Sequence, residues 1–456
     1  MINEHGMIHS DSHTSSQIYG SQHLKPTCFL KRRRLAVNAV ILGICSGLVA
    51  VCFRLGLEKA EHLRETFLGF FTSAYFLLPS AVLATLITLT VLVVTYYAPE
   101  SSGSGIPHLK GVLHEGFEFR DVRVLIVKFF GGIVAIGSGL ALGREGPTVQ
   151  MGASTGSILS RWFGSNEEER ELMICSGAGA GLAAAFNAPL AGLLFIIEEL
   201  HLRYDKFSLV AAFGATISGT LVCRLILGQA PIFSFKVLHY PALHLIFWCL
   251  VFGVVLGFCG LFFNTFLIKS LRRFSHHKIF LAVTLGLAFG FIGLHYPQLL
   301  GSGHNLIAEI MAGKFSLSLL FLLFFGRFFL TMLSYNTGVP GGIFAPLLLL
   351  GAIMGGIFFN LVEYVHPGEF RLEIFLVLGM GGLFTAIVRS PLTGIVLILE
   401  MTNEFFLLLP LMLVAIVAYG IPEYFANRPI YDGLLLYSLE KKRYYKTPVD
   451  PTRTNV

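Results

Sequence analysis

Charged side chains are scarce in this sequence: Asp, Glu, Lys and Arg make up only 13% of its 456 residues. Soluble globular proteins average about 25%, so the composition argues against a water-soluble enzyme or binding protein. Hydrophobic residues make up 54% of the chain, and its mean hydropathy is +0.72. The sequence is therefore predicted to be an integral membrane protein.

Signatures of metal and nucleotide chemistry are also missing. The sequence contains no HExxH pair for zinc and no phosphate-binding loop that ends in Gly-Lys-Ser/Thr, so nothing points to a zinc protease or an ATP-driven pump. The 7 cysteines include no CxxC pair. We interpret them as small residues that fill the core, and we expect no metal site.

Long hydrophobic runs, by contrast, are abundant. A span of the hydrocarbon takes about 20 mostly apolar residues, and about eleven such segments follow one another along the chain. The chain is thus predicted to cross the membrane many times. The segments begin near Ala36, Tyr75, Val124, Met173, Phe207, Leu243, Ile279, Leu317, Ile343, Glu373 and Phe405.

Basic residues flank this apolar region, and because cytoplasmic segments carry an excess of Lys and Arg, both termini are expected in the cytoplasm. The polar N-terminal segment does not resemble a cleaved secretory signal. The net charge of +6 is interpreted as a determinant of orientation, and nucleic-acid binding is not expected. The flanking residues are Lys31, Arg32, Arg33, Arg34, Lys441, Lys442, Arg443 and Lys446.

An internal repeat divides the chain. Residues 177–199 (GAGAGLAAAFNAPLAGLLFIIEE) align without a gap to residues 379–401 (GMGGLFTAIVRSPLTGIVLILEM), at a constant shift of 202 positions. In this alignment Glu198 falls on Glu400, which suggests a shared structural role. Many transporters are built from paired repeats around a site at the membrane midplane. We predict repeat halves at roughly 35–230 and 231–440, between an N-terminal segment 1–34 and a tail 441–456.

Short polar breaks rich in Gly and Pro recur in both halves. GSG at residues 103–105 recurs at 301–303, and GREGP at 143–147 has its counterpart in GVPGGIFAP at 338–346. Proline suits the first turn of a helix, so these breaks predict helices that begin inside the membrane. The free N–H groups and positive dipole end of such a helix favour an anion. Several such starts around one point predict a site for a small anion.

Glu145 stands in the GREGP break, where an ionised carboxylate costs at least ~2.5–3.5 kcal/mol at the membrane centre. The helix start that attracts an anion also stabilises this carboxylate. One alternative is a buried ion pair with Arg144, but adjacent residues on a helix point in different directions.

Four motifs in order give a family resemblance: GSGIP (103–107), GREGP (143–147), GGIFAP (341–346) and the tyrosine of NRPIY, Tyr431. Together they are similar to the signature set of the CLC chloride channels and chloride/proton exchangers. The similarity extends from about residue 33 to about residue 440. It is closest to bacterial exchangers that lack a cytoplasmic nucleotide-binding tail, because only about fifteen polar residues follow Glu440.

The resemblance implies a fold and a reaction. The fold is an all-α polytopic membrane protein of two inverted-topology repeats with many tilted and broken helices. The reaction is secondary active exchange of chloride for protons, by a transporter that is no enzyme and needs no cofactor. Homodimers in a bacterial inner membrane are implied as well. The alternative within the family is a passive chloride channel.

Site residues follow from the same resemblance. Chloride binds the hydroxyls of Ser104 and Tyr431 and the N–H groups of Ile343 and Phe344. A second anion position lies near the backbone of Arg144 and Gly146. Since plant nitrate exchangers tend to carry proline at the serine position, Ser104 favours chloride as the substrate.

Two carboxylates carry the proton in this comparison. Glu145 is the external gate and proton carrier, and Glu199 receives protons from the inside. Passive channels usually lack the second carboxylate, so Glu199 favours exchange. The alternative is that Glu198 and Glu199 are only the charged end of a helix, but Glu199 falls on Met401 in the repeat, which suggests a special role.

One stretch departs from the family pattern. Many bacterial members have acidic residues after GSGIP, whereas this chain reads His108-Leu109-Lys110. The basic residues leave the details of proton supply open. His108 is interpreted as a surface histidine at a helix end, with a pH sensor as the alternative.

Overall fold

The computed structural model describes residues 26–71, 76–202, 205–230, 233, 244–313 and 315–446, and the predicted polar segments at both ends lie mostly outside this range. Within it the chain is helical apart from turns and two isolated β-bridges. The first half contains α1 (Pro26–Gly69), α2 (Leu77–Tyr96), α3 (Ile106–His114), α4 (Asp121–Gly137), α5 (Glu145–Trp162), α6 (Glu167–Phe186), α7 (Pro189–Glu198) and α8 (Lys206–Leu227).

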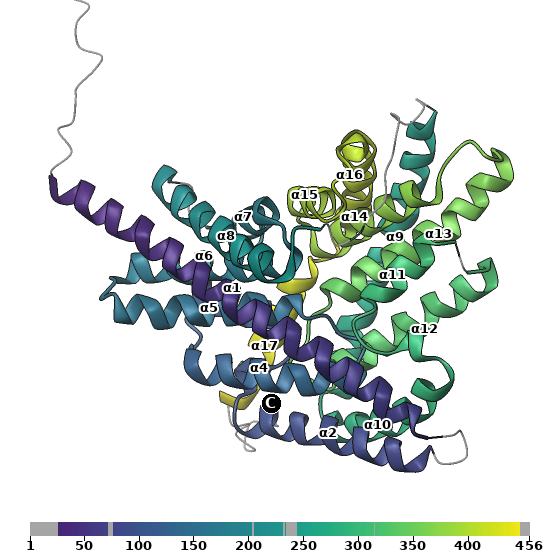
Figure 1. The fold of residues 1–456 in the computed structure, drawn as a ribbon, viewed down its shortest axis with the longest axis horizontal. Helices are drawn as coiled ribbons and strands as arrows, with labels where there is room; N and C mark the ends of the chain where they lie inside the picture. The colour runs from purple at the N-terminus through teal and green to yellow at the C-terminus, as the bar shows by residue number, and fades with distance from the viewer. Residues whose placement is uncertain are drawn as a thin grey trace, which may run out of the picture.

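The second half contains the helices that follow α8, together with short 3-10 turns such as η3 (Pro297–Leu299). Figure 1 shows the two sets of helices side by side. They are α9 (Leu245–Phe274), α10 (Lys278–His295), α11 (His304–Met311), α12 (Leu317–Asn336), α13 (Phe344–Val365), α14 (Leu372–Val388), α15 (Pro391–Thr402), α16 (Leu408–Tyr424) and α17 (Ile430–Lys446).

The eleven predicted apolar segments all fall on helices: α1, α2, α4, α6, α8, α9, α10, α12, α13, α14 and α16. Eight helices in the described part of the chain are long and apolar enough to cross a membrane. The eight omit α4 and α14, which are 17 residues long, and α6, which begins with three glutamates. Sequence reasoning did not count the short helices α3, α7, α11 and α15, because each is too short to span the hydrocarbon.

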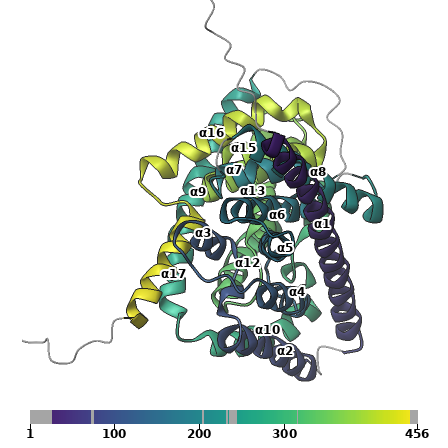
Figure 2. The ribbon, with the colours of Figure 1, turned by 90° about the vertical axis from the view of Figure 1, so that its left-hand side faces the viewer.

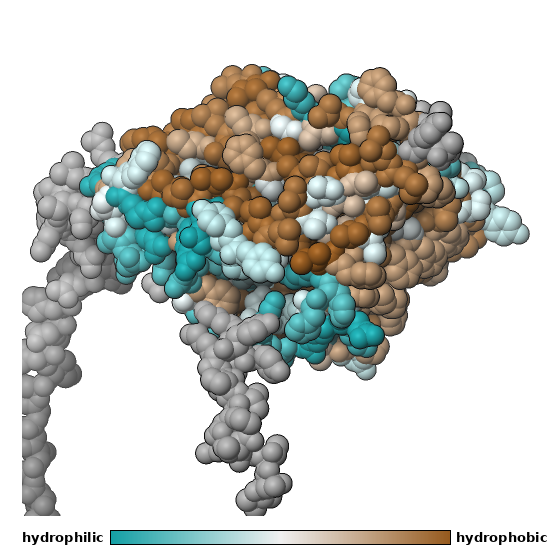
Figure 3. All heavy atoms as spheres, turned by 90° about the horizontal axis from the view of Figure 1, so that it is seen from below, coloured by the Kyte–Doolittle hydropathy of each residue, from teal (hydrophilic) through white to brown (hydrophobic). Residues whose placement is uncertain are grey.

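The outer surface is apolar, as a lipid-facing surface must be. Side chains such as Leu225 (76% exposed) and Ile416 (66% exposed) point outward from α8 and α16. Figure 3 shows apolar residues over much of one face, with hydrophilic residues gathered below and to the left. The protein is therefore a multi-pass membrane protein.

Three helices, α5, α6 and α13, are buried over most of their length and form the interior. Figure 2 shows α5, α6, α12 and α13 in the middle, with α1 on one side and α17 on the other. Of the 18 residues of α5, 15 are buried. Glycines bring these helices together: a Cβ on Gly152 would collide with the backbone of Gly177, and one on Gly351 with that of Gly379. The pairs α5–α6 and α13–α14 are equivalent in the two halves.

Backbone geometry repeats at the 202-residue shift as well. α6 is followed by Asn187 with φ of 56°, and α14 by Arg389 with φ of 69°. His201 and Asn403, also 202 positions apart, have φ of 54° and 60°. Residues other than glycine rarely adopt this left-handed conformation, so the pairing shows that both halves turn in the same way at the same places.

Glu198 and Glu400 have the shared structural role that the repeat suggested. The Glu198 carboxylate accepts hydrogen bonds from the N–H groups of Leu392 (3.0 Å) and Thr393 (2.7 Å) at the start of α15. Glu400 accepts from Leu190 (3.1 Å) and Ala191 (2.9 Å) at the start of α7. Each helix thus caps the start of the other, which satisfies N–H groups that have no partner within their own helix.

Candidate functional site

Four helices begin inside the molecule without a side-chain cap: α3, α5, α11 and α13. They begin at the four Gly-Pro-rich or GSG breaks that the sequence singled out. Away from the centre, α6, α8 and α12 are capped by Asn166, Asp205 and Ser316, whereas α2, α9 and α10 also begin without a cap. At the centre, the Ile106 N–H donates to the Ser104 hydroxyl at 3.4 Å. What sets the four central starts apart is that they are buried and lie together, and helix starts of this kind favour an anion.

Extended backbone from the two halves holds these starts together. Gly143 and Gly342 exchange hydrogen bonds of 2.7 and 2.8 Å, just before α5 and α13. The Gly103 N–H donates to Val339 at 3.0 Å, and the Gly301 N–H donates to Gly139 at 3.0 Å. Each GSG loop is thus tied to the stretch that leads into a long interior helix. The site lies where the two halves meet.

Ser104 and Tyr431 lie in the interior, and both side chains are fully buried. The Tyr431 hydroxyl has no hydrogen-bond partner among the described residues. Its ring stacks on Phe344 at 6.1 Å between centroids. A Cβ on Gly146, at the start of α5, would lie 2.8 Å from the Ser104 Cβ. A buried hydroxyl costs free energy unless it finds a partner, so Tyr431 is well suited to donate to an anion.

Glu145 is the first residue of α5 and is fully buried. Its Oε1 lies 3.1 Å from the Nε2 of His304, the first residue of α11, and 3.9 Å from the Nε of Arg144. The second distance is too long for a hydrogen bond, and Arg144 also reaches Glu58 at 3.5 Å. The neighbouring arginine is therefore not the closest partner of this carboxylate. Its other oxygen, Oε2, has no partner in the described structure.

Glu199 belongs to a separate network at the C-terminal end of α7. It accepts a hydrogen bond of 2.8 Å from Lys110 of α3 and one of 3.1 Å from Ser390. Lys110 also contacts Asp432 of α17, which is 43% exposed. Glu199 is therefore not simply a charged helix end in water: it is buried and paired, and Asp432 connects the pair to the surface.

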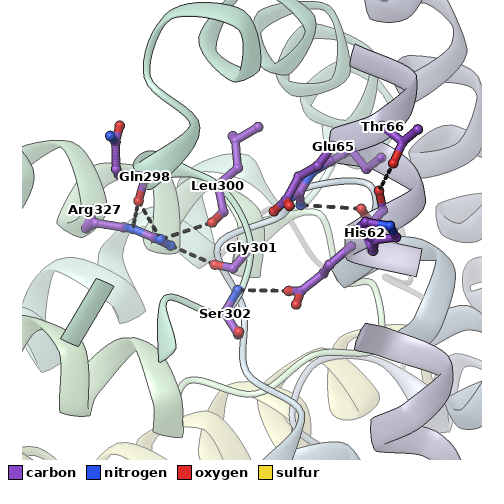
Figure 4. A network of polar contacts seen from close by, with 11 residues as sticks. His62, Glu65, Thr66, Gln298, Leu300, Gly301, Ser302 and Arg327 are labelled. Atoms are coloured by element: carbon purple, nitrogen blue, oxygen red, sulfur yellow. Dashed lines mark hydrogen bonds and ion pairs between the residues drawn. The ribbon is translucent and has the colours of Figure 1, made fainter. Parts of the chain in front are cut away.

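Two buried cations hold the GSG loops in equivalent ways. In the first half, the Lys128 ammonium of α4 donates to the carbonyls of Ser101 (2.9 Å) and Gly103 (2.7 Å). In the second half, Arg327 of α12 donates to the carbonyls of Gln298, Leu300 and Gly301, as Figure 4 shows. Because both cations are bonded to carbonyls, they fix the loops without neutralising a carboxylate.

Two cavities approach the site from opposite directions. One, of about 640 Å³, is lined by Gly103, Tyr335 and Lys278, the first residue of α10. The other, of about 720 Å³, is lined by Arg144, His304 and Pro297, two residues beyond the end of α10. A helix of 18 residues is about 27 Å long at 1.5 Å per residue. The cavities thus lie near opposite ends of α10. Buried Ser104 contacts Tyr335 at the first cavity, and buried Glu145 contacts His304 at the second.

Comparisons with known proteins agree with this architecture. Residues 86–423 match the family model for the voltage gated chloride channel. The H(+)/Cl(-) exchange transporter ClcA of Vibrio parahaemolyticus serotype O3:K6 is 37% identical over 423 residues, which cover 89% of this chain and 90% of that protein. The chain belongs to the voltage-gated chloride channel family. The ClcA of Salmonella arizonae is 38% identical over 423 residues, covering 90% of this chain and 89% of that protein.

Solved structures of the family share the fold. A slow cyanobacterial Cl-/H+ antiporter superposes with a TM-score of 0.86 at 32% identity, covering 90% of this chain and 99% of that one. A CLC-type fluoride/proton antiporter superposes with a TM-score of 0.76 at 21% identity, covering 89% of this chain and 98% of that one. The second likeness supports the fold alone. The all-α, two-repeat CLC fold predicted from the sequence is confirmed.

The structure gathers most of the predicted site residues of this voltage-gated chloride channel family member. Ser104, Gly146, Phe344 and Tyr431 lie together, with Ile343 as the residue before α13. The Arg144 side chain instead points to the cavity that His304 lines. Their roles in chloride binding and proton transfer stay predictions.

Sequence reasoning missed several buried partners in the centre of the fold. His304 could have been found from the repeat, because it directly follows the second GSG motif. Ile106 follows the first GSG motif in the same way. Tyr335 contacts Ser104, with nothing in the sequence to mark it. His108 lies in the first turn of α3, as expected for a helix end, but it is half-buried at the cavity of about 640 Å³, with its Nδ1 at 3.3 Å from Gln150.

One serine pattern was also missed. Residues 152–156 read Gly-Ala-Ser-Thr-Gly, which fits the Gly-x-Ser-x-Gly pattern of α/β-hydrolases. The pattern requires a sharp strand-to-helix turn. Here Ser154 lies inside α5, and its hydroxyl donates to the Gln150 carbonyl at 2.9 Å. The match does not form a nucleophile elbow.

Proposed function

We propose that this protein exchanges chloride for protons across the membrane, driven only by the two gradients and without a cofactor. The observation that carries the proposal is the position of Glu145: a buried carboxylate at an uncapped helix start, between two cavities that approach from opposite sides. If the Glu145 carboxylate blocks the chloride pathway and must be protonated to leave it, chloride movement is coupled to proton movement. Relatives named as exchangers support exchange over simple conduction.

Chloride and the Glu145 carboxylate compete in this mechanism. Both are anions, and both are attracted to the same N–H groups at the start of α5. A chloride that arrives from the Ser104 side favours protonation of Glu145, because two like charges at close range repel. The neutral side chain then leaves the position, chloride passes, and Glu145 carries a proton the other way.

Proton supply from the opposite side runs through Glu199. Asp432 is partly exposed, Lys110 contacts both carboxylates, and Glu199 lies buried behind them. Lys110 stabilises the ionised form of Glu199, so that a proton taken up there is readily released again. This path is distinct from the cavity that reaches Ser104 through Tyr335 and Gly103.

The surroundings of the transporter are part of the proposal. We expect a homodimer in a bacterial inner membrane, with an independent pathway in each subunit and both termini in the cytoplasm. On this orientation the cavity beside His304 opens to the outside and the cavity beside Tyr335 opens to the cytoplasm.

Reconstitution into liposomes tests the function. Liposomes loaded with high chloride are diluted into low chloride while the external pH is recorded. Exchange predicts that chloride efflux drives proton uptake, so the external pH rises even against an opposing proton gradient. Chloride efflux with no effect on pH would instead support the passive channel.

A further inference from the structure

We infer that His304 is a positioning residue for Glu145: its imidazole holds the carboxylate in the place where it blocks the anion path. The inference rests on the proposed competition between chloride and Glu145. Each residue is the first of a helix, α5 in one half and α11 in the other, and the two side chains meet at 3.1 Å. Neither helix has a side-chain cap.

The contact between Glu145 and His304 lies at the boundary between the buried interior and a cavity. Glu145 has no exposed surface, whereas His304 is 16% exposed and lines the cavity of about 720 Å³. Its Nδ1 has no hydrogen-bond partner among the described residues, which leaves Nε2 as the atom that donates to the carboxylate. A hydrogen bond to the ionised form of an acid favours that form. His304 therefore stabilises the blocking carboxylate.

Other charges around the cavity do not replace this contact. The α1 helix contributes Arg54, Glu58, Glu61, His62, Arg64 and Glu65. Arg144 precedes α5, Glu309 lies on α11 and Arg327 on α12. Four arginines therefore face four glutamates, and their fields largely cancel at a distance. The cavity groups closest to the Glu145 carboxylate are His304 and, at 3.9 Å, Arg144.

The affinity for chloride distinguishes two roles of His304: holding the Glu145 carboxylate in place, or attracting chloride directly. If His304 holds the competing carboxylate, His304→Phe should tighten chloride binding by about fivefold at pH 7.5, since a hydrogen bond of about 1 kcal/mol is lost. If the imidazole instead attracted chloride itself, the same change would weaken binding. Isothermal titration of the purified full chain with chloride measures the difference.

A double-mutant cycle provides the decisive comparison. In the Glu145→Gln background, His304→Phe should leave chloride affinity unchanged, because no carboxylate is left to hold. His304→Gln, which retains an N–H donor, should stay near the wild-type affinity. His295→Phe, an exposed histidine at the end of α10, is the matched control. His304→Ala repeats the test should the phenylalanine variant fail to elute as a folded species in size-exclusion chromatography.

The pH profile of chloride flux gives a second readout. In the proposed competition, protonation of Glu145 opens the path, so flux should rise as the pH falls. Loss of the donor makes the ionised carboxylate less stable, so this rise should move to higher pH by about 0.7 unit in His304→Phe. The Glu145→Gln background should show no shift. If His304→Phe leaves chloride affinity unchanged, or changes it equally in the wild-type and Glu145→Gln backgrounds, the role of His304 is overturned while the proposed function stands. Absence of proton coupling in the wild type, together with an intact cycle, would overturn the proposed function and leave the role of His304 standing.

Discussion

The two halves of this protein share a backbone but differ in the side chains at equivalent helix starts. α5 begins with Glu145 and α13 with Phe344, each after a Gly-containing break and each without a cap. α7 ends beside Glu199, whereas the equivalent residue of α15 is Met401. Both protonatable residues of the proposed mechanism therefore come from the first half.

The comparison separates the anion site from proton coupling. Paired helix starts, with their free N–H groups, are a property of the repeated backbone and are present in both halves. The carboxylates of Glu145 and Glu199, by contrast, occur in the first half only, since the second half has Phe344 and Met401 at these places. We infer that the repeat forms the place for an anion, and that the difference between the halves links this place to protons.

The largest expected effect comes from removal of the first carboxylate. Glu145→Ala should abolish chloride-driven proton movement while chloride flux continues, because the blocking anion and the proton carrier are lost together. Proton uptake by liposomes is the measurement. Glu168→Gln, a change at an exposed position in the first turn of α6, is the control. Proton coupling that persists in Glu145→Ala would remove this residue from the mechanism.

Glu199→Met introduces into the first half the residue type that Met401 provides in the second half. We expect chloride flux to continue and proton coupling to fall at least about tenfold, because a thioether cannot take up a proton. Glu198→Gln next to it should keep coupling intact. Equal loss of coupling in both variants would show that α7 is disturbed as a whole and that Glu199 has no special role.

Lys110→Met tests the charge that faces Glu199. Without the ammonium at 2.8 Å, the buried carboxylate takes up its proton at a higher pH. The midpoint of proton flux against the pH on the Asp432 side should therefore rise by about one unit. Lys59→Met, an exposed lysine of α1, should leave the profile unchanged. A downward shift would contradict the proposed pairing.

The smallest effect is expected where the halves are alike. Glu198→Gln and Glu400→Gln each weaken two charge-assisted hydrogen bonds to backbone N–H groups, so each should cost about 1 kcal/mol. The two variants should lower the apparent Tm in detergent by similar amounts. A much larger loss for one of them would break the equivalence of the two caps.

The positions of helix starts and spans could be read from the sequence because their causes are local. Long apolar runs, Gly-Pro breaks and the 202-residue repeat predicted α5, α13 and the equivalence of Glu198 with Glu400. The mutual capping itself was not predicted, because it requires α7 and α15 to face each other. Even so, the repeat alignment indicated that these two glutamates share a role.

The sequence by itself determined the class of protein, the two-repeat fold and the residue types available to bind an anion and carry a proton, because composition and backbone-breaking residues act locally. Only the tertiary structure decided the partners of those residues. His304 is 159 positions from Glu145, and Lys110 is 89 positions from Glu199. Such pairs are formed by the packing of whole helices, and no periodicity or local motif along the chain encodes which charges meet.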